Sequence, residues 1–360
     1  MKRVFVSDCE GPISKNDNAF EMTCHFVPCG DKLFKIISRY DDVLADVVRK
    51  PNYEAGTTLK LILPFLKAYH VNDGKMQDFS TQSLILISNV QKTLNHIERL
   101  APAFMVSTSY EHYVRTLCRT IGFPFENTYC TRLSIDKYGI TDTERKELQL
   151  LAGEISRMPM FDIPQAAKSL QDLPEKARAA TRRLDEIFWR QIASMQVGRV
   201  FAEVSIVGGT GKVEAVRDIV HKQGIRLSEV MYVGDSITDE ETFKLVRGGG
   251  GLTVSFNGNK YAVQNAEVAV LCEDSTVTGI LAEAFLKHGR QKTLDLVEHW
   301  KREALLKSCE DNDFLSLFFR LYPGELPKVK IVTKENMEIL MKESTCFRKK
   351  VRGEAVGRLG

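Results

Sequence analysis

The sequence lacks any apolar run long enough to cross a membrane. Its most apolar stretches, such as residues 59–66, are far shorter than the roughly 20 residues that a spanning helix needs. A strand-like segment starts almost directly after Met1, so we expect no signal peptide before the fold. These two observations argue against membrane insertion.

The chain also lacks a marked excess of charge of either sign. It has 50 Lys and Arg residues against 47 Asp and Glu residues, for a formal net charge of +3. This balance gives no support for binding to nucleic acid or to a membrane surface. The densest basic run consists of Arg348, Lys349, Lys350 and Arg352. We expect it to be a solvated tail, with binding of an anionic partner as the less favoured alternative.

The eight cysteines lack the regular spacing of a disulfide framework. Cys24 and Cys29 lie close together, but no second cysteine pair or histidine pair completes a zinc site. We therefore expect reduced and mostly buried thiols, which indicate a cytoplasmic protein.

What the sequence does contain is the composition of a globular protein, with 43% hydrophobic and 27% charged residues. Amphipathic helical patterns alternate with five short apolar runs that predict strands, at residues 4–6, 103–106, 230–233, 251–256 and 268–271. This alternation predicts an α/β fold with a Rossmann-like parallel sheet covered on both faces. Residues 132–141 alternate apolar and polar side chains and predict a further strand or hairpin. Thr141 and Glu144 then have the spacing of a helix-capping box.

Four polar features follow one another along the chain, and three of them come directly after predicted strands. They are Asp8-Cys9-Glu10-Gly11, Ser107, Lys212, and the Gly-Asp-Ser-Ile-Thr-Asp segment 234–239. The carboxyl ends of parallel strands gather in one crevice of such a fold, so these side chains are expected to converge there.

The chemistry of these groups is consistent with a shared task. Clustered carboxylates repel one another unless a cation joins them, and ligands that are all oxygen favour Mg²⁺. The cation would also let an anionic carboxylate attack an anionic phosphate. A hydroxyl and an ammonium would hold the phosphate oxygens, where charge sits in the transition state.

These motifs resemble the four motifs of the haloacid-dehalogenase (HAD) superfamily. The resemblance extends to segments 211–224, 229–243, 254–257 and 266–270, whose order and spacing are similar to those of the phosphoserine-phosphatase branch. It covers the core, about half of the chain. It implies a magnesium-dependent phosphohydrolase of small phosphorylated metabolites.

The resemblance also implies a role for each residue. Asp8 matches the nucleophile and Glu10 the general acid and base. The Mg²⁺ ligands would be the Asp8 carboxylate, the backbone carbonyl of Glu10 and Asp235. Asp239 would support the metal or the lysine, with capping of the following helix as an alternative.

Ser107 and Lys212 match the phosphate-binding residues. Thr108 or Ser109 could take the place of Ser107, which we favour because it directly follows the apolar strand.

The motifs depart from the family pattern at two positions. Most relatives have Asp where this chain has Glu10, and Thr where it has Pro12. Some relatives also have Asp-x-Glu-Gly, including a phosphoserine–homoserine phosphotransferase. The sequence therefore leaves open whether water or an alcohol accepts the phosphoryl group.

The resemblance divides the chain into a HAD core, a helical cap, a helical insertion and a C-terminal helical extension. The core comprises residues 1–14, 90–142 and 199–287, the cap 15–89, the insertion 143–198 and the extension 288–360. Asp17, Asn18 and Glu21 begin the cap, where a polar end of the substrate would be recognised.

A second hypothesis is an accessory protein that keeps the HAD core but acts through partners. The insertion 143–198 and the C-terminal extension 288–360 motivate it, because a minimal phosphatase needs neither. The insertion could carry a homo-oligomer contact or bind a partner protein. The sequence also resembles an archaeal group assigned as subunit R of energy-converting hydrogenase A. The pair Asp8 and Glu10 argues against this hypothesis, since a scaffold has no physical reason to keep an acid and base.

Overall fold

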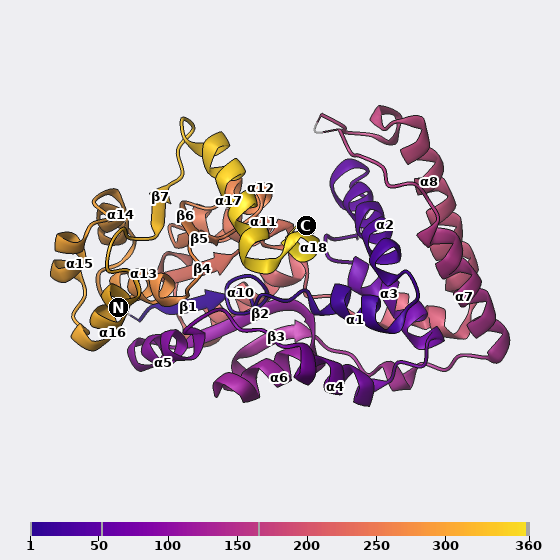
Figure 1. The fold of residues 1–360 in the computed structure, drawn as a ribbon, viewed down its shortest axis with the longest axis horizontal. Helices are drawn as coiled ribbons and strands as arrows, with labels where there is room; N and C mark the ends of the chain where they lie inside the picture. Colours follow the sequence, from indigo (N-terminus) through magenta and orange to yellow (C-terminus); the bar gives the residue numbers. More distant parts are fainter. Residues whose placement is uncertain (1, 52, 165, 358–360) are drawn as a thin grey trace.

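A mostly parallel seven-stranded sheet forms the centre of the part of the chain that is described (Figure 1). The computed structural model describes residues 2–51, 53–164 and 166–357. The strand order is β3-β2-β1-β4-β5-β6-β7, and only β7 runs antiparallel to its neighbour. The predicted α/β class is therefore confirmed. The strands are β1 (Val4–Ser7), β2 (Ala103–Tyr110), β3 (Thr128–Thr131), β4 (Val230–Gly234), β5 (Leu252–Phe256), β6 (Val268–Leu271) and β7 (Lys328–Ile331).

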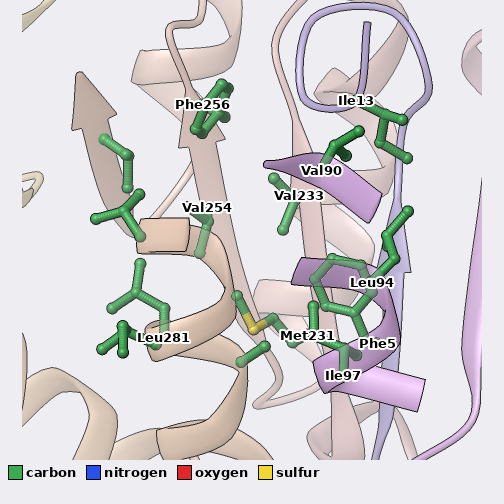
Figure 2. Close-up of a cluster of buried hydrophobic side chains, with 14 of the residues drawn as sticks. Phe5, Ile13, Val90, Leu94, Ile97, Met231, Val233, Val254, Phe256 and Leu281 are labelled. Carbon is green, nitrogen blue, oxygen red and sulfur yellow. The ribbon is translucent and has the colours of Figure 1, made fainter. Parts of the chain in front are cut away.

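Helices cover both faces of the sheet, because alternate side chains of its buried strands point to opposite faces. Phe5, Met231 and Val254 point to one face, where they pack with helices α5 (Val90–Leu100), α6 (Glu111–Ile121) and α13 (Thr276–His288) (Figure 2). Val6 and Tyr232 point to the other face, towards α10 (Gly209–Gln223), α11 (Glu240–Gly248) and α12 (Lys260–Asn265). No described helix has the length and apolar character needed to cross a membrane. The cysteines are free thiols, and five of the eight are buried, as expected.

A second group of helices packs beyond the carboxyl end of the sheet and has its own core. It combines the expected cap and the expected insertion, because side chains such as Leu33, Ile62, Leu148 and Ile187 belong to one hydrophobic cluster. The helices of this unit, called the helical unit below, are α1 (Asn18–Phe26), α2 (Gly30–Asp42), α3 (Thr58–Ala68), α4 (Asp73–Ser83), α7 (Asp142–Ser156), α8 (Glu175–Glu186) and α9 (Val200–Glu203).

The C-terminal extension contacts both units. It contains the antiparallel strand β7 as well as α14 (Arg290–Glu298), α15 (Arg302–Ser308), α16 (Asn312–Leu321), α17 (Met337–Arg352) and α18 (Glu354–Gly357). Leu340 of α17 packs against Val263 of α12 on the sheet side. The chain turns at Gly353, which has a φ of +83°, and α18 then inserts Val356 into the core of the helical unit.

The predicted strand or hairpin at residues 132–141 is wrong. The strand in this region is β3, which ends at Thr131. The alternation of apolar residues after it has another cause, because Leu133, Ile135 and Tyr138 are buried in the core of the helical unit rather than against a sheet. The predicted capping box of Thr141 and Glu144 is confirmed, and it starts α7.

His96 of α5 lies between two carboxylates and joins three helices. Its Nε2 is 3.1 Å from Glu283 Oε2 on α13, and its Nδ1 is 3.2 Å from Asp311 Oδ2, without hydrogen-bond geometry at the second contact. Burial opposes ionisation of Glu283, but hydrogen bonds from His96, the Glu310 amide and Lys287 outweigh it and lower its pKa to about 2. The ionised Glu283 carboxylate therefore stabilises the folded state at neutral pH.

We expect Glu283→Gln to lower the free energy of unfolding at pH 7 by up to about 3 kcal/mol. The pKa of Glu283 is about 2 when folded and 4.5 in its ordinary state, so the unfolded chain binds the proton first as the pH falls. The difference from wild type should be complete above pH 4.5 and should vanish towards pH 2. Urea unfolding across this range measures it, with the exposed Glu298→Gln as the control. A difference independent of pH would contradict this account.

Candidate active site

Asp8 lies directly after β1, at the edge where the parallel strands end. Its Oδ2 accepts a hydrogen bond from Lys212 Nζ at 2.6 Å, and its Oδ1 accepts one from the Cys9 amide at 2.6 Å. Lys212 belongs to the first turn of α10 and is fully buried. The structure thus brings together two predicted site residues that are far apart in the sequence.

Asp239 is the second carboxylate that accepts a hydrogen bond from Lys212, at 2.7 Å. The same oxygen, Oδ1, accepts a hydrogen bond from the Tyr232 hydroxyl at 2.7 Å, and Oδ2 accepts from the amides of Asp235 and Ser236 at 2.9 and 3.0 Å. Its side chain does not cap α11, so that alternative is wrong. Asp239 holds Lys212 in place and fixes the loop after β4.

Asp235 completes a group of three buried carboxylates. Asp8, Asp235 and Asp239 each offer an oxygen, and these oxygens lie within 4.8 Å of one another. β1 and β4 are adjacent parallel strands, which explains why the loops after them meet. Gly11, with a φ of +105°, passes so close to Asp235 that an added Cβ would overlap its carboxylate. Gly11 is therefore required because any larger residue at this position would collide with Asp235 of the segment 234–239.

We expect Gly11→Ala to destabilise the protein by more than about 2 kcal/mol, since it adds a collision to the strain of positive φ. Gly250→Ala is the matched control. Gly250 has a φ of +82°, but an added Cβ would meet nothing closer than 3.5 Å. The control should cost about 1 kcal/mol. Equal losses in urea unfolding would show that the contact with Asp235 is not the cause.

Burial and neighbouring charges shift the pKa values of these groups in different directions. Burial raises the pKa of Asp8 to about 7, with Lys212 opposing this shift and Asp239 adding to it. Burial disfavours the charge of Lys212, but Asp239 and Asp8 more than compensate and raise its pKa. The charge and hydrogen bond of Lys212, helped by the Tyr232 hydroxyl, lower the pKa of Asp239 despite burial. Lys212 and Asp239 are therefore an ion pair, and a further cation would favour the ionised form of Asp8.

Glu10 lies two residues after Asp8, with its carboxyl directed towards the start of α1. Its Oε1 accepts a hydrogen bond from the Asn18 amide at 2.7 Å. Burial and repulsion by Asp17 raise the pKa of Glu10 well above its ordinary value, and the Asn18 amide opposes them. This shift favours the protonated form, which is the form that a general acid requires.

The candidate phosphate-binding hydroxyls lie within β2, and not after the strand as expected. Ser107 is buried within β2, which extends to Tyr110, and its Oγ accepts a hydrogen bond from the Ser109 amide at 3.2 Å. Thr108 lines the cavity beside Asp8, and its Oγ1 is buried without a hydrogen-bond partner. Ser109 Oγ is also buried without a hydrogen-bond partner, but Ser109 is not among the residues that line the cavity. The phosphate-binding role of Ser107 stays a prediction, with Thr108 as the neighbour whose hydroxyl is available at the cavity.

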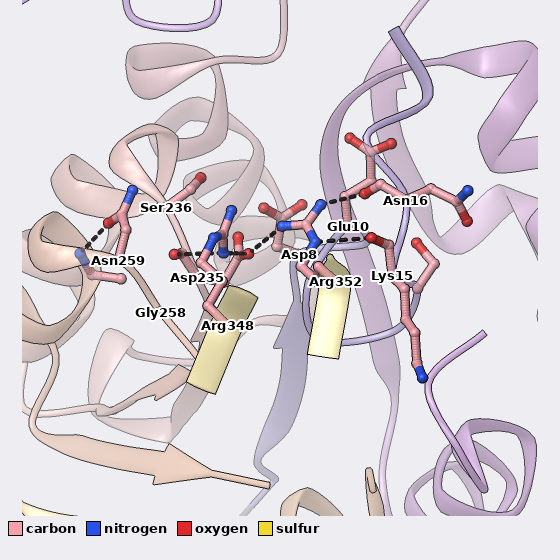
Figure 3. A network of polar contacts seen from close by, with 12 residues as sticks. Asp8, Glu10, Lys15, Asn16, Asp235, Ser236, Gly258, Asn259, Arg348 and Arg352 are labelled. Carbon is pink, nitrogen blue, oxygen red and sulfur yellow. Dashed lines mark hydrogen bonds and ion pairs between the residues drawn. The ribbon is translucent and has the colours of Figure 1, made fainter. Parts of the chain in front are cut away.

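Arg348 and Arg352 are site residues that the sequence did not reveal. Both side chains are only 4% exposed, and both guanidinium groups bind Asp235 Oδ2, with Arg352 Nη1 at 2.8 Å (Figure 3). The expected solvated tail is therefore wrong for these two residues. The exposed Lys350 instead pairs with Glu273 at the surface. The cause is the packing of α17 on α12, which no local pattern in the basic run reports.

Carboxylates dominate the small cavity next to Asp8. Its volume is about 110 Å³, and its lining includes Glu10, Asp17 and Asp41 besides Asp8 and Asp235, with Arg348 and Arg352 as its cations. Of the residues expected to contact a substrate's polar end, Asp17 lines this cavity. The other two have structural contacts: the Asn18 amide binds Glu10, and Glu21 accepts a hydrogen bond from Asn16 at 2.7 Å.

The three carboxylates suit a divalent metal ion such as Mg²⁺, because their donor atoms are all oxygen. Asp239 uses both oxygens within the protein, whereas Asp8 Oδ1 accepts only the Cys9 amide. The arginines occupy Asp235 Oδ2, and no described residue is seen to donate to Asp235 Oδ1. Asp8 and Asp235 thus have capacity for a cation, and Asp239 supports them.

Comparison with known proteins relates the whole chain to one solved structure. A gene product from Archaeoglobus fulgidus has a TM-score of 0.80 at 25% identity, over 100% of this chain and 99% of that one. Its fold is therefore shared along the entire chain, C-terminal extension included. No protein-family model and no curated protein matches the sequence.

Phosphoserine phosphatase structures are much looser matches. An apo form and a substrate-bound form have TM-scores of 0.43 and 0.45 at 14% identity. They cover 81% and 78% of this chain, and 100% and 97% of their own. This likeness is too weak to assign an activity, which must be inferred from the site.

Proposed function

We propose that the protein is a Mg²⁺-dependent phosphohydrolase of the HAD type, acting on small phosphomonoesters. One observation carries the proposal: Asp8, Lys212, Asp235 and Asp239 converge at the ends of β1 and β4, in the order and spacing of the HAD motifs. A buried lysine between two carboxylates beside an acidic cavity has no evident structural purpose that a pair of apolar side chains could not serve.

In the proposed reaction, an Asp8 oxygen attacks phosphorus and the bond from phosphorus to the leaving oxygen breaks. Glu10, whose raised pKa favours its protonated form, gives its proton to that oxygen. Glu10 then accepts a proton from water, whose oxygen attacks the phosphoryl group on Asp8. The bond between Asp8 and phosphorus breaks, and inorganic phosphate leaves.

Lys212 has one N–H left after its bonds to Asp8 and Asp239, which can be donated to a phosphoryl oxygen. Ser107, or its neighbour Thr108, would supply a hydroxyl to another oxygen. Mg²⁺, held by Asp8, the carbonyl of Glu10 and Asp235, would neutralise the charge that separates nucleophile and phosphate.

Phosphate release from p-nitrophenyl phosphate and from a metabolite panel that includes phosphoserine tests this proposal. We expect release only with Mg²⁺. Adding small alcohols to the same assay separates a hydrolase from a phosphotransferase, because a transferase would yield the new ester. A folded, metal-loaded protein that neither releases nor transfers phosphate would refute both activities.

The arginines on Asp235 favour one second candidate, an accessory protein without turnover. Arg348 and Arg352 occupy a carboxylate oxygen at the expected metal site. A stable complex with a partner in a pull-down experiment, together with absent phosphate release, would support this candidate. Phosphate release by the isolated chain would exclude it.

A further inference from the structure

We propose that residues 348–357, the C-terminal segment, act as an intramolecular inhibitor that competes with the divalent cation for Asp235. The proposal rests on the metal site of the proposed function. It is tested by metal binding and chain mobility, so it can fail or hold independently of turnover.

The contacts of the two arginines define the competition. Arg348 Nη1 binds both the Oδ2 atom and the backbone carbonyl oxygen of Asp235, the latter at 3.3 Å. Arg352 binds the same Oδ2 atom, and it also donates to the carbonyl oxygens of Lys15, at 2.9 Å, and Asn16 (Figure 3). Two guanidinium groups therefore satisfy a buried carboxylate that would otherwise need a metal ion.

Charge repulsion disfavours the binding of a divalent cation to Asp235 while both guanidinium groups remain in contact with it. The ion pairs around Asp235 already bring three cations, Lys212, Arg348 and Arg352, to Asp8, Asp235 and Asp239, although the cavity lining adds further carboxylates such as Glu10 and Asp17. A divalent cation at Asp235 would lie near both guanidinium groups, in surroundings that screen charge poorly. Removing one guanidinium, or moving it away, therefore favours metal binding.

The C-terminal segment can leave while the rest of α17 stays in place. The earlier part of the helix is anchored by Leu340 in an apolar cluster and by a 2.6 Å hydrogen bond from Ser344 Oγ to the Gly258 carbonyl oxygen. Arg348 is held less completely, since its Nε is buried without a hydrogen-bond partner. That orphan donor lowers the cost of giving up the contact with Asp235.

The same segment also lies between the two units of the molecule. Arg348 and Arg352 line the cavity, and Val356 of α18 is buried in the core of the helical unit. Figure 1 shows α18 between the sheet and the helices of that unit. Displacing the segment would therefore free Asp235 and loosen the contact between core and helical unit in one movement. Metal loading and access to the cavity become linked.

Isothermal calorimetry with Mg²⁺ and Mn²⁺ on the full chain tests the competition. We expect Arg348→Met to tighten metal binding by about ten-fold, equivalent to about 1.4 kcal/mol. Arg348→Lys keeps the charge and should show a smaller gain. Lys342→Met, an equal loss of charge at an exposed position of the same helix, should leave the affinity unchanged. Weaker or unchanged binding in Arg348→Met would overturn the proposal, because it would make the arginine a support for the metal or irrelevant to it.

Hydrogen exchange on the wild-type protein provides a test that needs no variant to fold. Mg²⁺ should increase deuterium uptake in residues 348–357 and leave the anchored residues 337–344 unchanged. Increased uptake confined to 348–357 supports displacement by the metal. Unchanged or decreased uptake in that segment would overturn it, even if the enzyme proves active.

Discussion

Asp8→Asn should abolish Mg²⁺-dependent phosphate release, with a loss of at least about 10⁴-fold, because the amide cannot form the bond to phosphorus. The substitution keeps the shape of a side chain that is buried among two other carboxylates. Burial already favours the neutral form of Asp8, whose pKa is raised to about 7, so a neutral replacement suits the site. Both oxygens of Asp8 accept hydrogen bonds, from the Cys9 amide and from Lys212, and the amide nitrogen of Asn must face one of these donors. The folded state should be kept, with a loss of stability of about 1–3 kcal/mol.

Phosphate release and urea unfolding, measured on the same preparation, check both parts of this expectation. Asp31→Asn is the control, since Asp31 is half-exposed on α2 and makes only a 3.7 Å surface contact with Lys35. It should retain full activity. Turnover by Asp8→Asn near the wild-type rate would remove Asp8 as the nucleophile.

Lys212→Met should cause the largest loss of stability, about 3–5 kcal/mol, besides the loss of activity. Lys212 is fully buried, and it binds Asp8 at 2.6 Å and Asp239 at 2.7 Å. Removing its charge leaves two buried carboxylates that repel each other without a cation between them. Methionine fills similar space, so the loss should come from the charge and not from a cavity.

A matched control and a rescue make this prediction specific. Lys222→Met removes the same charge from the exposed end of the same helix, where the partner is Asp218, and should cost less than about 1 kcal/mol. Adding Asp239→Asn to Lys212→Met should recover part of the stability, because one of the uncompensated charges disappears. Equal losses in Lys212→Met and Lys222→Met, measured by urea unfolding, would contradict the buried ion-pair cluster.

The position of the site, at the edge where the parallel strands end, could be predicted from the sequence alone. Short apolar runs mark the strands that end at Asp8 and Asp235, and parallel strands collect their following residues at one edge. Lys212 was predicted to join them from the Gly-Lys motif, which lies in the first turn of α10. The convergence of these residues thus depends on local pattern and on one general rule of sheet topology.

The contacts of the C-terminal extension could not be predicted in the same way. Arg348 meets Asp235 only because α17 packs on α12 and because β7 pairs antiparallel with β6. The local sequence of the basic run predicts neither the packing of α17 nor the pairing of β7. Its composition is as typical of a solvated surface as of a buried ion pair. The strand β7 was hidden too, as a short edge segment with two exposed lysines at Lys328 and Lys330.

The segment 132–141 shows the complementary failure. Its alternation of apolar and polar side chains is real, but Leu133, Ile135 and Tyr138 are buried against helices. Ile135–Lys137 form a short 3-10 helix, so the buried side chains do not keep the period of two that a strand requires. Tertiary packing, which the local pattern does not contain, decided the outcome.

Trapping the phosphorylated protein during turnover tests the central claim most directly. Acid quenching preserves an acyl phosphate, and borohydride reduction converts a phosphorylated aspartate to homoserine, which peptide mass spectrometry locates. We expect homoserine at position 8 in the wild-type protein incubated with Mg²⁺ and substrate, and none without Mg²⁺. Active protein that carries no modification at position 8, or carries the phosphoryl group on another residue, would contradict it.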